Sequence, residues 1–160
     1  MNVLTVRVCN TVLRNCHCWS PAQKVQLDFD TASSDIWFSI ATCNTAVCKT
    51  HHRFNFAKST TVKKDGRPWK IPYGDSSNSS DILGSDMPLE SSQFAQSPED
   101  GLFGLGFNTI ESVSGVKTFL DNAIVANILT QPVISVFLPS AHRNGGKGGN
   151  YLFGDIDKTR

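Results

Sequence analysis

Asp30 is a carboxylate placed where it could do chemistry. Val25, Leu27 and Phe29 alternate with polar residues before it, which is the pattern of a half-buried strand, and the small residues 31–34 follow it. An acid at the end of such a strand is either a turn former that accepts backbone N–H groups or a carboxyl displayed for general acid–base catalysis. The residue type alone leaves both interpretations open.

A serine–histidine nucleophile is not indicated. The sequence contains no Gly-x-Ser-x-Gly element, and its four histidines, at positions 17, 51, 52 and 142, have no diagnostic spacing. We interpret the neighbouring His51 and His52 as part of a solvated loop rather than as a catalytic base.

Cofactor and metal sites are not indicated either. The segment 101–106 reads GLFGLG, which is not the G-x-G-x-x-G of dinucleotide-binding folds, and SGVKT at 114–118 lacks the Gly-Lys pair of a phosphate loop. Cys16, His17 and Cys18 have no second Cys or His pair at zinc spacing. The sequence therefore predicts no metal and no cofactor.

The composition predicts one soluble domain. The chain has 160 residues, of which 39% are hydrophobic, and this is enough for a single core. Because the net charge is +1 and the Lys and Arg residues are scattered, we expect no nucleic-acid partner. No apolar run approaches the roughly 18 residues of a membrane span, so no membrane partner is expected. The first twenty residues lack the apolar core of a signal peptide.

The cysteines fall into two groups. Cys43 and Cys48 close a short loop, which makes a disulfide between them feasible and points to an oxidising compartment. Cys9, Cys16 and Cys18 lie near the N-terminus, and the odd total of five leaves at least one thiol unpaired if that disulfide forms.

Short strands separated by Gly- and Ser-rich turns dominate the rest of the sequence. Residues 69–84 read as a hairpin with a polar tip, and Pro72 places its first arm at a sheet edge. Apolar residues recur at helical spacing over 118–129, which predicts one amphipathic helix. Residues 133–138 and 150–154 read as two strands of a second hairpin. The predicted fold class is all-β, with one or two short helices.

Five sequence elements in this order resemble the N-terminal lobe of a pepsin-like aspartic protease of fungal type. They are DTASSDIW at 30–37, the Cys43 to Cys48 loop followed by HHRFN, a hairpin containing YGD at 73–75, ILG at 82–84 and DGLFGLGF at 100–107. The resemblance divides the chain into an unmatched segment, 1–19, and a partial aspartic protease lobe, 20–160. It implies an incomplete copy of the lobe found in the pepsin-like double-barrel fold.

The resemblance implies a catalytic role for Asp30. In this family the matching Asp shares a proton with a second Asp from the other lobe, and the pair activates a water molecule without any cofactor. Thr31, Ala32 and Ser33 match the loop that supports this carboxyl, and Ser33 matches a residue that hydrogen-bonds its outer oxygen.

The resemblance also implies a flap and a substrate pocket. The hairpin tip matches a flap that closes over bound peptide, and its residues are Tyr73, Gly74 and Asp75. Trp37 matches a tryptophan that anchors the flap tyrosine. Phe94 and Leu102 match residues that line the pocket beside the scissile bond, and the element around Leu102 matches one that packs under the catalytic loop.

Three features depart from the family pattern. No second Asp-Thr-Gly or Asp-Ser-Gly element occurs, so the other carboxyl is expected from a second lobe or a second copy. Ala32 stands where the family has glycine, and its methyl group adds bulk beside the carboxylate. Asn78, Ser79 and Ser80 form an N-glycosylation acceptor sequence beside the flap.

Three functions remain open at this stage. The first is an aspartic endopeptidase lobe that acts on peptide or protein substrates outside the cell or in a vacuole. The second is an inactive pseudoprotease that binds peptides, suggested by Ala32 and the missing second Asp. The third is a β-rich structural module that retains the motifs without their chemistry.

Overall fold

The structure is a computed structural model that describes residues 5–7, 13–18, 21, 23–60, 66–72, 78–82, 96–138 and 149–158. Short strands make up most of its regular structure, which confirms the predicted mainly-β class. The strands are β1 (Thr5–Arg7), β2 (Leu13–Cys18), β3 (Gln23–Asp30), β4 (Ile36–Phe38), β5 (Pro68–Pro72), β6 (Asn78–Ile82), β7 (Gly101–Gly104), β8 (Ile134–Phe137) and β9 (Asn150–Phe153). The helices are α1 (Ala46–Lys49) and α2 (Phe119–Val125).

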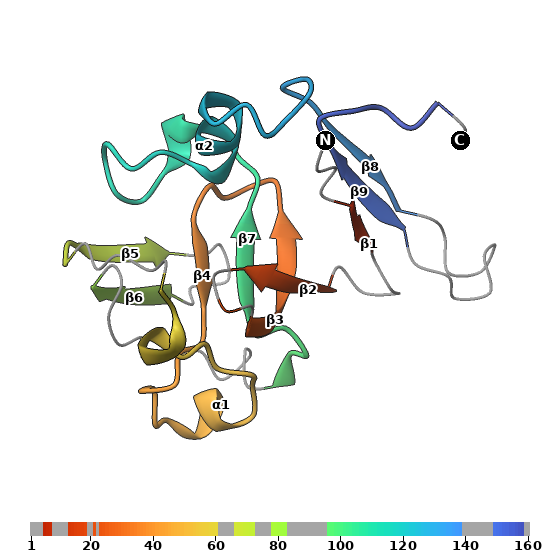
Figure 1. Cartoon of the computed structure of the whole chain (residues 1–160). Helices are drawn as coiled ribbons and strands as arrows, with labels where there is room; N and C mark the ends of the chain where they lie inside the picture. The colour runs from red at the N-terminus through yellow and green to blue at the C-terminus, as the bar shows by residue number, and fades with distance from the viewer. Residues whose placement is uncertain are drawn as a thin grey trace.

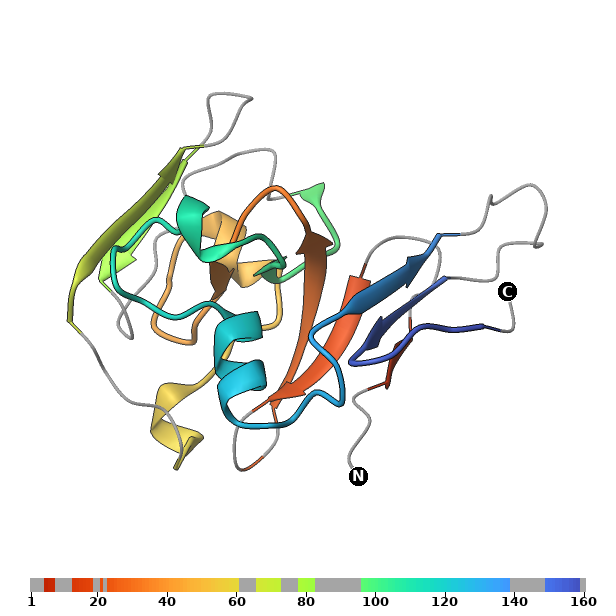
Figure 2. The same ribbon diagram turned by 90° about the horizontal axis from the view of Figure 1, so that it is seen from above.

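A central sheet carries the segment of greatest interest. Its strand order is β2-β3-β7-β4, with β3 and β7 parallel and the other neighbours antiparallel. A second sheet, β1-β9-β8, lies to one side, and the β5–β6 hairpin lies on the other (Figures 1 and 2). Strands β1 and β2 thus join residues before position 20 to both sheets.

The core lies where these layers meet. Val25, Leu27 and Phe29 are 0%, 1% and 6% exposed, so the alternation in the sequence correctly predicted the buried face of β3. The Phe29 ring centroid lies 5.0 Å from that of Phe103 in β7 and 4.7 Å from that of Tyr151 in β9. Aromatic packing therefore joins the central sheet to the second sheet.

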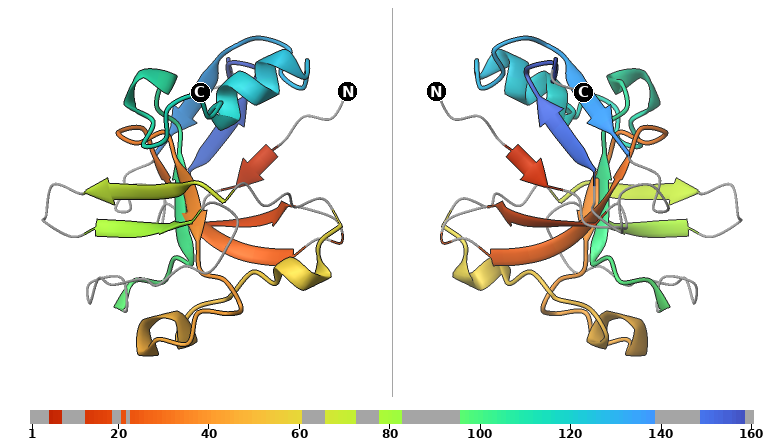
Figure 3. Two further views of the ribbon diagram at one scale, coloured as in Figure 1. Left: turned by 90° about the vertical axis from the view of Figure 1, so that its left-hand side faces the viewer. Right: turned by 90° about the vertical axis from the view of Figure 1, so that its right-hand side faces the viewer.

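Both predicted hairpins form. Strand β5 pairs with β6 in antiparallel register, and β8 pairs with β9 in the same way. The β5–β6 strands run across the direction of β4 and β7 (Figures 1 and 3). The tip of the first hairpin, with Tyr73, Gly74 and Asp75, lies outside the described residues, and so does Phe94.

The predicted helix over 118–129 is too long. A capping box between Thr118 and Asp121 begins α2, but the helix ends at Val125, and Asn127 adopts a left-handed φ of 53°. Ile124 and Ile128, expected to face the core, are 45% and 56% exposed. The helix ends early because Asn127 adopts the left-handed conformation, which Asn tolerates better than most residues. The apolar pattern of the sequence continues beyond this turn and therefore overestimates the length of the helix.

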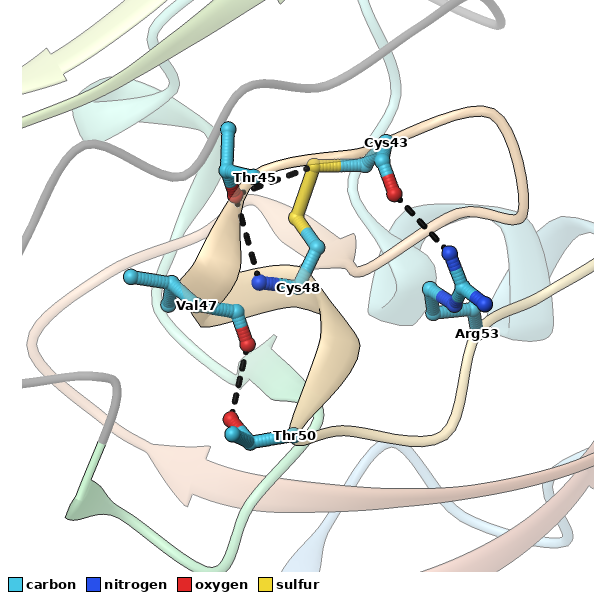
Figure 4. The surroundings of a disulfide bond; sticks show 6 residues. All are labelled: Cys43, Thr45, Val47, Cys48, Thr50 and Arg53. Atoms are coloured by element: carbon cyan, nitrogen blue, oxygen red, sulfur yellow. Dashed lines mark hydrogen bonds between the residues drawn. A yellow bond between two sulfur atoms is a disulfide. The ribbon is translucent and has the colours of Figure 1, made fainter.

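The predicted disulfide between Cys43 and Cys48 is present, with Cα atoms 5.9 Å apart (Figure 4). The Thr45 hydroxyl accepts a hydrogen bond from the Cys48 N–H at 3.2 Å and caps α1 inside the closed loop. Arg53 Nη1 donates to the Cys43 carbonyl at 3.0 Å. Helix cap, disulfide and arginine thus brace the segment 43–53 from within.

None of the helices in the described part of the chain has the length and apolar character needed to span a bilayer.

Candidate active site

Asp30 is the last residue of β3 and the register partner of Gly104 in the parallel strand β7. Its backbone carbonyl accepts a hydrogen bond from Leu105 N–H at 2.7 Å, so the end of β3 is fixed to the segment that follows β7. The residue is partly exposed, and Thr31 and Ala32 after it are exposed. The fold thus presents the Asp30 carboxyl at a strand end that solvent can reach.

Glycines in and after β7 let the Asp30 loop approach closely. A Cβ atom on Gly104 would stand 2.6 Å from the backbone N and O atoms of Asp35. A Cβ on Gly106 would stand 2.8 Å from the carbonyl oxygen of Ser33. Because real Cβ atoms do not make such contacts, only glycine allows the loop to pack on β7 in this way. Gly104 and Gly106 therefore allow the loop that follows Asp30 to pack closely on β7 and on the segment after it.

Backbone hydrogen bonds hold the same loop. Gly104 N–H donates to the Asp35 carbonyl at 2.9 Å, and Gly106 N–H donates to the Ser33 carbonyl at 2.7 Å. The Ser34 hydroxyl donates to the Phe107 carbonyl at 2.5 Å. These contacts tie residues 33–35 to the segment 104–107.

The Asp30 carboxylate has a local donor. Its Oδ1 atom accepts a hydrogen bond from Ala32 N–H at 2.8 Å, which is a turn contact two residues along the chain. The turn-former interpretation and the displayed-carboxyl interpretation are therefore compatible: one oxygen is oriented by the backbone.

The expected hydrogen bond from Ser33 to Asp30 is absent in the structure. The Ser33 hydroxyl is buried and has no hydrogen-bond partner among the described residues, and Ala32 N–H is the donor to the carboxylate instead. The physical reason is that the Ser33 carbonyl is held by Gly106 N–H while the turn brings Ala32 N–H within reach of the carboxylate oxygen.

Ala32 fits its position without backbone strain. Among the described residues other than glycine, Asn127 is the one with a positive φ, so position 32 does not demand glycine. The alanine is also exposed, and its methyl group does not displace packed atoms.

An acidic neighbour shares the polar face of β3 with Asp30. Burial, followed by repulsion from Glu99 and then from Asp30, raises the pKa of the Asp28 carboxyl to about 6, although a hydrogen bond from the backbone of Phe29 opposes the shift. The charge of Asp30 thus disfavours the ionised form of Asp28.

A cavity of about 490 Å³ opens beside Thr31. Its wall is mostly apolar and comes from the segment after β7, from α2 and from β8. The lining residues are Thr31, Leu105, Gly106, Phe107, Asn108, Thr118, Leu120, Asp121, Ile124, Leu129, Pro132, Ile134 and Val136. The partial exposure of Ile124 follows from its place in this wall.

The predicted pocket residues lie elsewhere. Leu102 is the register partner of Asp28 on one side and of Trp37 on the other, and neither Leu102 nor Trp37 lines the cavity. Trp37 is 7% exposed and belongs to the core. Their role beside a substrate stays a prediction, since the expected partners Tyr73 and Phe94 lie outside the described residues.

The sequence interpretation missed the role of Asp100. This residue is 1% exposed, and its carboxylate accepts hydrogen bonds from Gln26 N–H and from His52 N–H, each at 2.7 Å. Its own N–H donates to the Gln26 carbonyl at 2.6 Å. Asp100 thus joins β3 to the loop that follows α1. The sequence signal for this role is the acid that begins DGLFGLGF, which the family resemblance uses only as part of a motif.

The solvated-loop interpretation is wrong for His51 and correct for His52. His51 Nδ1 lies 3.8 Å from Asp100 Oδ1, and the His51 side chain is 2% exposed. His52 Nδ1 lies 3.2 Å from Asp100 Oδ2, but that side chain is 58% exposed. His51 turns inward because the disulfide loop brings it against the buried carboxylate.

No group of His, Cys, Asp and Glu side chains that could hold a metal ion occurs within the described ranges. Cys16 and Cys18 lie in β2, and Cys9 is outside the described residues.

Comparisons with known proteins find one family throughout. Residues 15–160 match the family model described as eukaryotic aspartyl protease. Rhizopuspepsin-3 of Rhizopus niveus is 41% identical over an alignment that covers 88% of this chain and 39% of the relative. Syncephapepsin of Syncephalastrum racemosum is 40% identical over 84% of this chain, and cathepsin E of Rattus norvegicus is 32% identical over 88%. The chain spans about two fifths of the length of these relatives.

Proposed function

Because the chain belongs to the eukaryotic aspartyl protease family, we propose that it supplies one lobe of an aspartic-type endopeptidase and that Asp30 is one of its two catalytic carboxyls. The observation that carries the proposal is the position of Asp30: it ends β3 beside Gly104, and its loop is held on β7 by contacts that only glycine permits.

The chemistry needs two carboxyls with different protonation states. Close carboxyls cannot both ionise, so one takes a proton from water while the other gives a proton to the scissile carbonyl. The Ala32 N–H that binds Asp30 Oδ1 orients the carboxylate and leaves the Oδ2 atom for water or for the shared proton. Thr31 and Ser33 belong to the same supporting loop.

The second carboxyl comes from a second lobe or from a second copy of this chain. The sequence holds a single Asp-Thr-x-Ser element, at 30–33, and a lone carboxyl lacks the acid that the reaction requires. Loss of one partner of such a pair costs roughly 10²- to 10⁴-fold in rate. The substrate is a peptide or an unfolded protein segment, over which Tyr73, Gly74 and Asp75 close as a flap, with Trp37, Leu102 and Phe94 beside the scissile bond.

The enzyme acts outside the cell or in a vacuole. The buried Cys43–Cys48 disulfide supports this location, because such bonds persist in oxidising compartments and are rare in the cytosol.

The proposal is tested by acid-dependent cleavage of a denatured protein at several concentrations of the chain. If a second copy supplies the other carboxyl, the initial rate rises with the square of concentration at low occupancy, and mixing with Asp30→Ala chains lowers it. If a separate lobe supplies it, activity appears only when that lobe is added. Cleavage at an unchanged rate by Asp30→Ala would refute the proposal, and Asp155→Asn, an exposed carboxyl that keeps its acceptor oxygen, is the matched control.

A second candidate is a peptide-binding pseudoprotease. Ala32 in place of the family glycine and the single Asp element favour it. Two measurements in the presence of a complementary lobe separate the two functions: binding of a statyl peptide, which mimics the tetrahedral transition state, and cleavage of a denatured protein. Binding of the statyl peptide without cleavage of the protein supports the pseudoprotease, and cleavage excludes it.

A further inference from the structure

The β5–β6 hairpin carries a modification signal that proteolysis does not use. Asn78, Ser79 and Ser80 form an Asn-x-Ser acceptor, and no other Asn-x-Ser or Asn-x-Thr occurs in the sequence. Asn78 is the first residue of β6 and the register partner of Pro72, the last residue of β5.

Strand register pairs the two ends of the acceptor, positions 78 and 80, with Pro72 and Lys70 of β5. Directly opposed residues of an antiparallel pair share a face, and the faces alternate along each strand. Positions 78 and 80 therefore share a face with Pro72 and Lys70, which are both exposed. The opposite face includes Ile71, which is 6% exposed and belongs to the core. Asn78 is thus paired with an exposed position of β5 and not with the buried Ile71.

The outer edge of β6 has no strand beside it among the described residues. The sheet that contains β5 and β6 has two strands in the described part of the chain, so the far edge of β6 has no neighbour there. An open edge is a template for pairing with another chain. Strand β5 begins and ends with Pro68 and Pro72, which have no N–H group to offer, but the sequence of β6, NSSDI, contains no proline.

We propose that Asn78 is an N-glycosylation site and that its glycan shields the open edge of β6. A lipid-linked oligosaccharyl diphosphate is the donor. The C1–O bond to the diphosphate breaks, a bond forms between C1 and Asn78 Nδ2, and the lipid diphosphate leaves with the amide proton. The transfer takes place in the oxidising compartment to which the Cys43–Cys48 disulfide points.

The modification is tested by expressing the whole chain in yeast behind a secretion leader. The secreted protein and the protein of the membrane fraction are both digested with a peptide N-glycosidase. Because the sugar is added during translocation, it can be detected in either fraction, even if the chain is poorly secreted. The wild-type chain is expected to shift in gel mobility on digestion. Asn78→Gln and Ser80→Ala are expected to lose the shift completely.

Ser79→Ala is the matched control, since it alters the neighbouring residue but keeps the acceptor. It is expected to retain the full shift. A wild-type chain without a shift, or an Asn78→Gln chain that keeps it, would overturn the site. Since occupancy is scored without any cleavage assay and the leader imposes the compartment, this outcome is independent of whether the chain is a protease lobe.

The location and the shielding have their own readouts. A glycan on the face shared with Pro72 and Lys70 is removed under native conditions as completely as after denaturation, and resistance under native conditions would contradict that location. In size-exclusion chromatography, Asn78→Gln is expected to show a larger share of associated species than Ser79→Ala at equal concentration. Identical elution profiles would refute the shielding role.

Discussion

Asp30 and Gly104 are register partners in the parallel pair of β3 and β7, and the missing side chain of Gly104 leaves room for the backbone of Asp35. The loop that follows Asp30 and the glycine-containing strand β7 therefore pack as one structural unit. A larger residue at position 104 would displace the backbone of Asp35 and, through this loop, the Asp30 carboxylate.

Gly104→Ala is expected to destabilise the fold by roughly 1–3 kcal/mol, because the added methyl group overlaps the backbone of Asp35 and forces the loop away. Urea denaturation measures the loss. Ala32→Gly, which removes only an exposed methyl group from the same loop, is the control and should change stability by less than about 1 kcal/mol. Equal stabilities for Gly104→Ala and the wild-type chain would show that the loop does not depend on this close approach.

Asp28 makes stability depend on pH. Its folded-state pKa of about 6 lies above the ordinary value of 3.8, so the folded chain holds this proton more tightly than the unfolded chain. The stabilisation is fully present below pH 3.8 and is lost as the pH rises through 6. Because the carboxyl is only half-buried, the effect is discounted to roughly 1–2 kcal/mol.

Asp28→Asn tests this directly. The variant should be more stable than the wild-type chain at pH 7, and the two should converge near pH 4, as measured by urea denaturation across this range. Asp155→Asn, at an exposed position, should leave the pH profile unchanged. An Asp28→Asn profile that falls as steeply as that of the wild-type chain between pH 4 and 6 would assign the dependence to another group.

Asp100 is expected to be a main determinant of stability. Asp100→Ala leaves the N–H groups of Gln26 and His52 without their buried acceptor, at a cost of about 3 kcal/mol or more. His52→Ala removes an exposed imidazole and keeps the backbone N–H, so it should cost less than about 1 kcal/mol. Comparable losses in guanidinium denaturation would mean that the imidazole rather than the carboxylate holds the loop.

The Cys43–Cys48 disulfide should contribute about 2 kcal/mol, since the closed loop is short and restricts the unfolded chain only modestly. Replacing both cysteines with serine measures this contribution by thermal and urea unfolding. The wild-type chain in reductant should fall to the same stability, and a reductant effect that persists in the double variant would have to come from other cysteines.

Local sequence patterns predicted individual strands such as β3, but they did not predict hydrogen bonds between residues far apart in the sequence. The alternation of Val25, Leu27 and Phe29 was enough to place β3 and its terminal acid, because strand period is a local property. The hydrogen bonds of Asp100 span 74 residues to Gln26 and 48 to His52, and no local pattern marks such partners.

The parallel pairing of β3 and β7 was not predicted, since the family resemblance implied only that the element around Leu102 packs under the loop after Asp30. The three glycines of DGLFGLGF are evident in the sequence, but only the structure shows that Gly104 and Gly106 accommodate the loop after Asp30. The end of α2 was missed for a different reason: the apolar period runs on to Ile128, while the turn at Asn127 depends on backbone conformation.

We propose that the Asp30 carboxyl faces the bound transition state. Calorimetric titration of a statyl peptide at acid pH, into the chain combined with its complementary lobe, measures this contact. The wild-type combination is expected to bind at least about tenfold more tightly than the Asp30→Asn combination, since a hydrogen bond to an ionised group contributes roughly 1.5–3 kcal/mol, and Asp155→Asn should match the wild-type. Equal affinities for Asp30→Asn and the wild-type chain would contradict the claim.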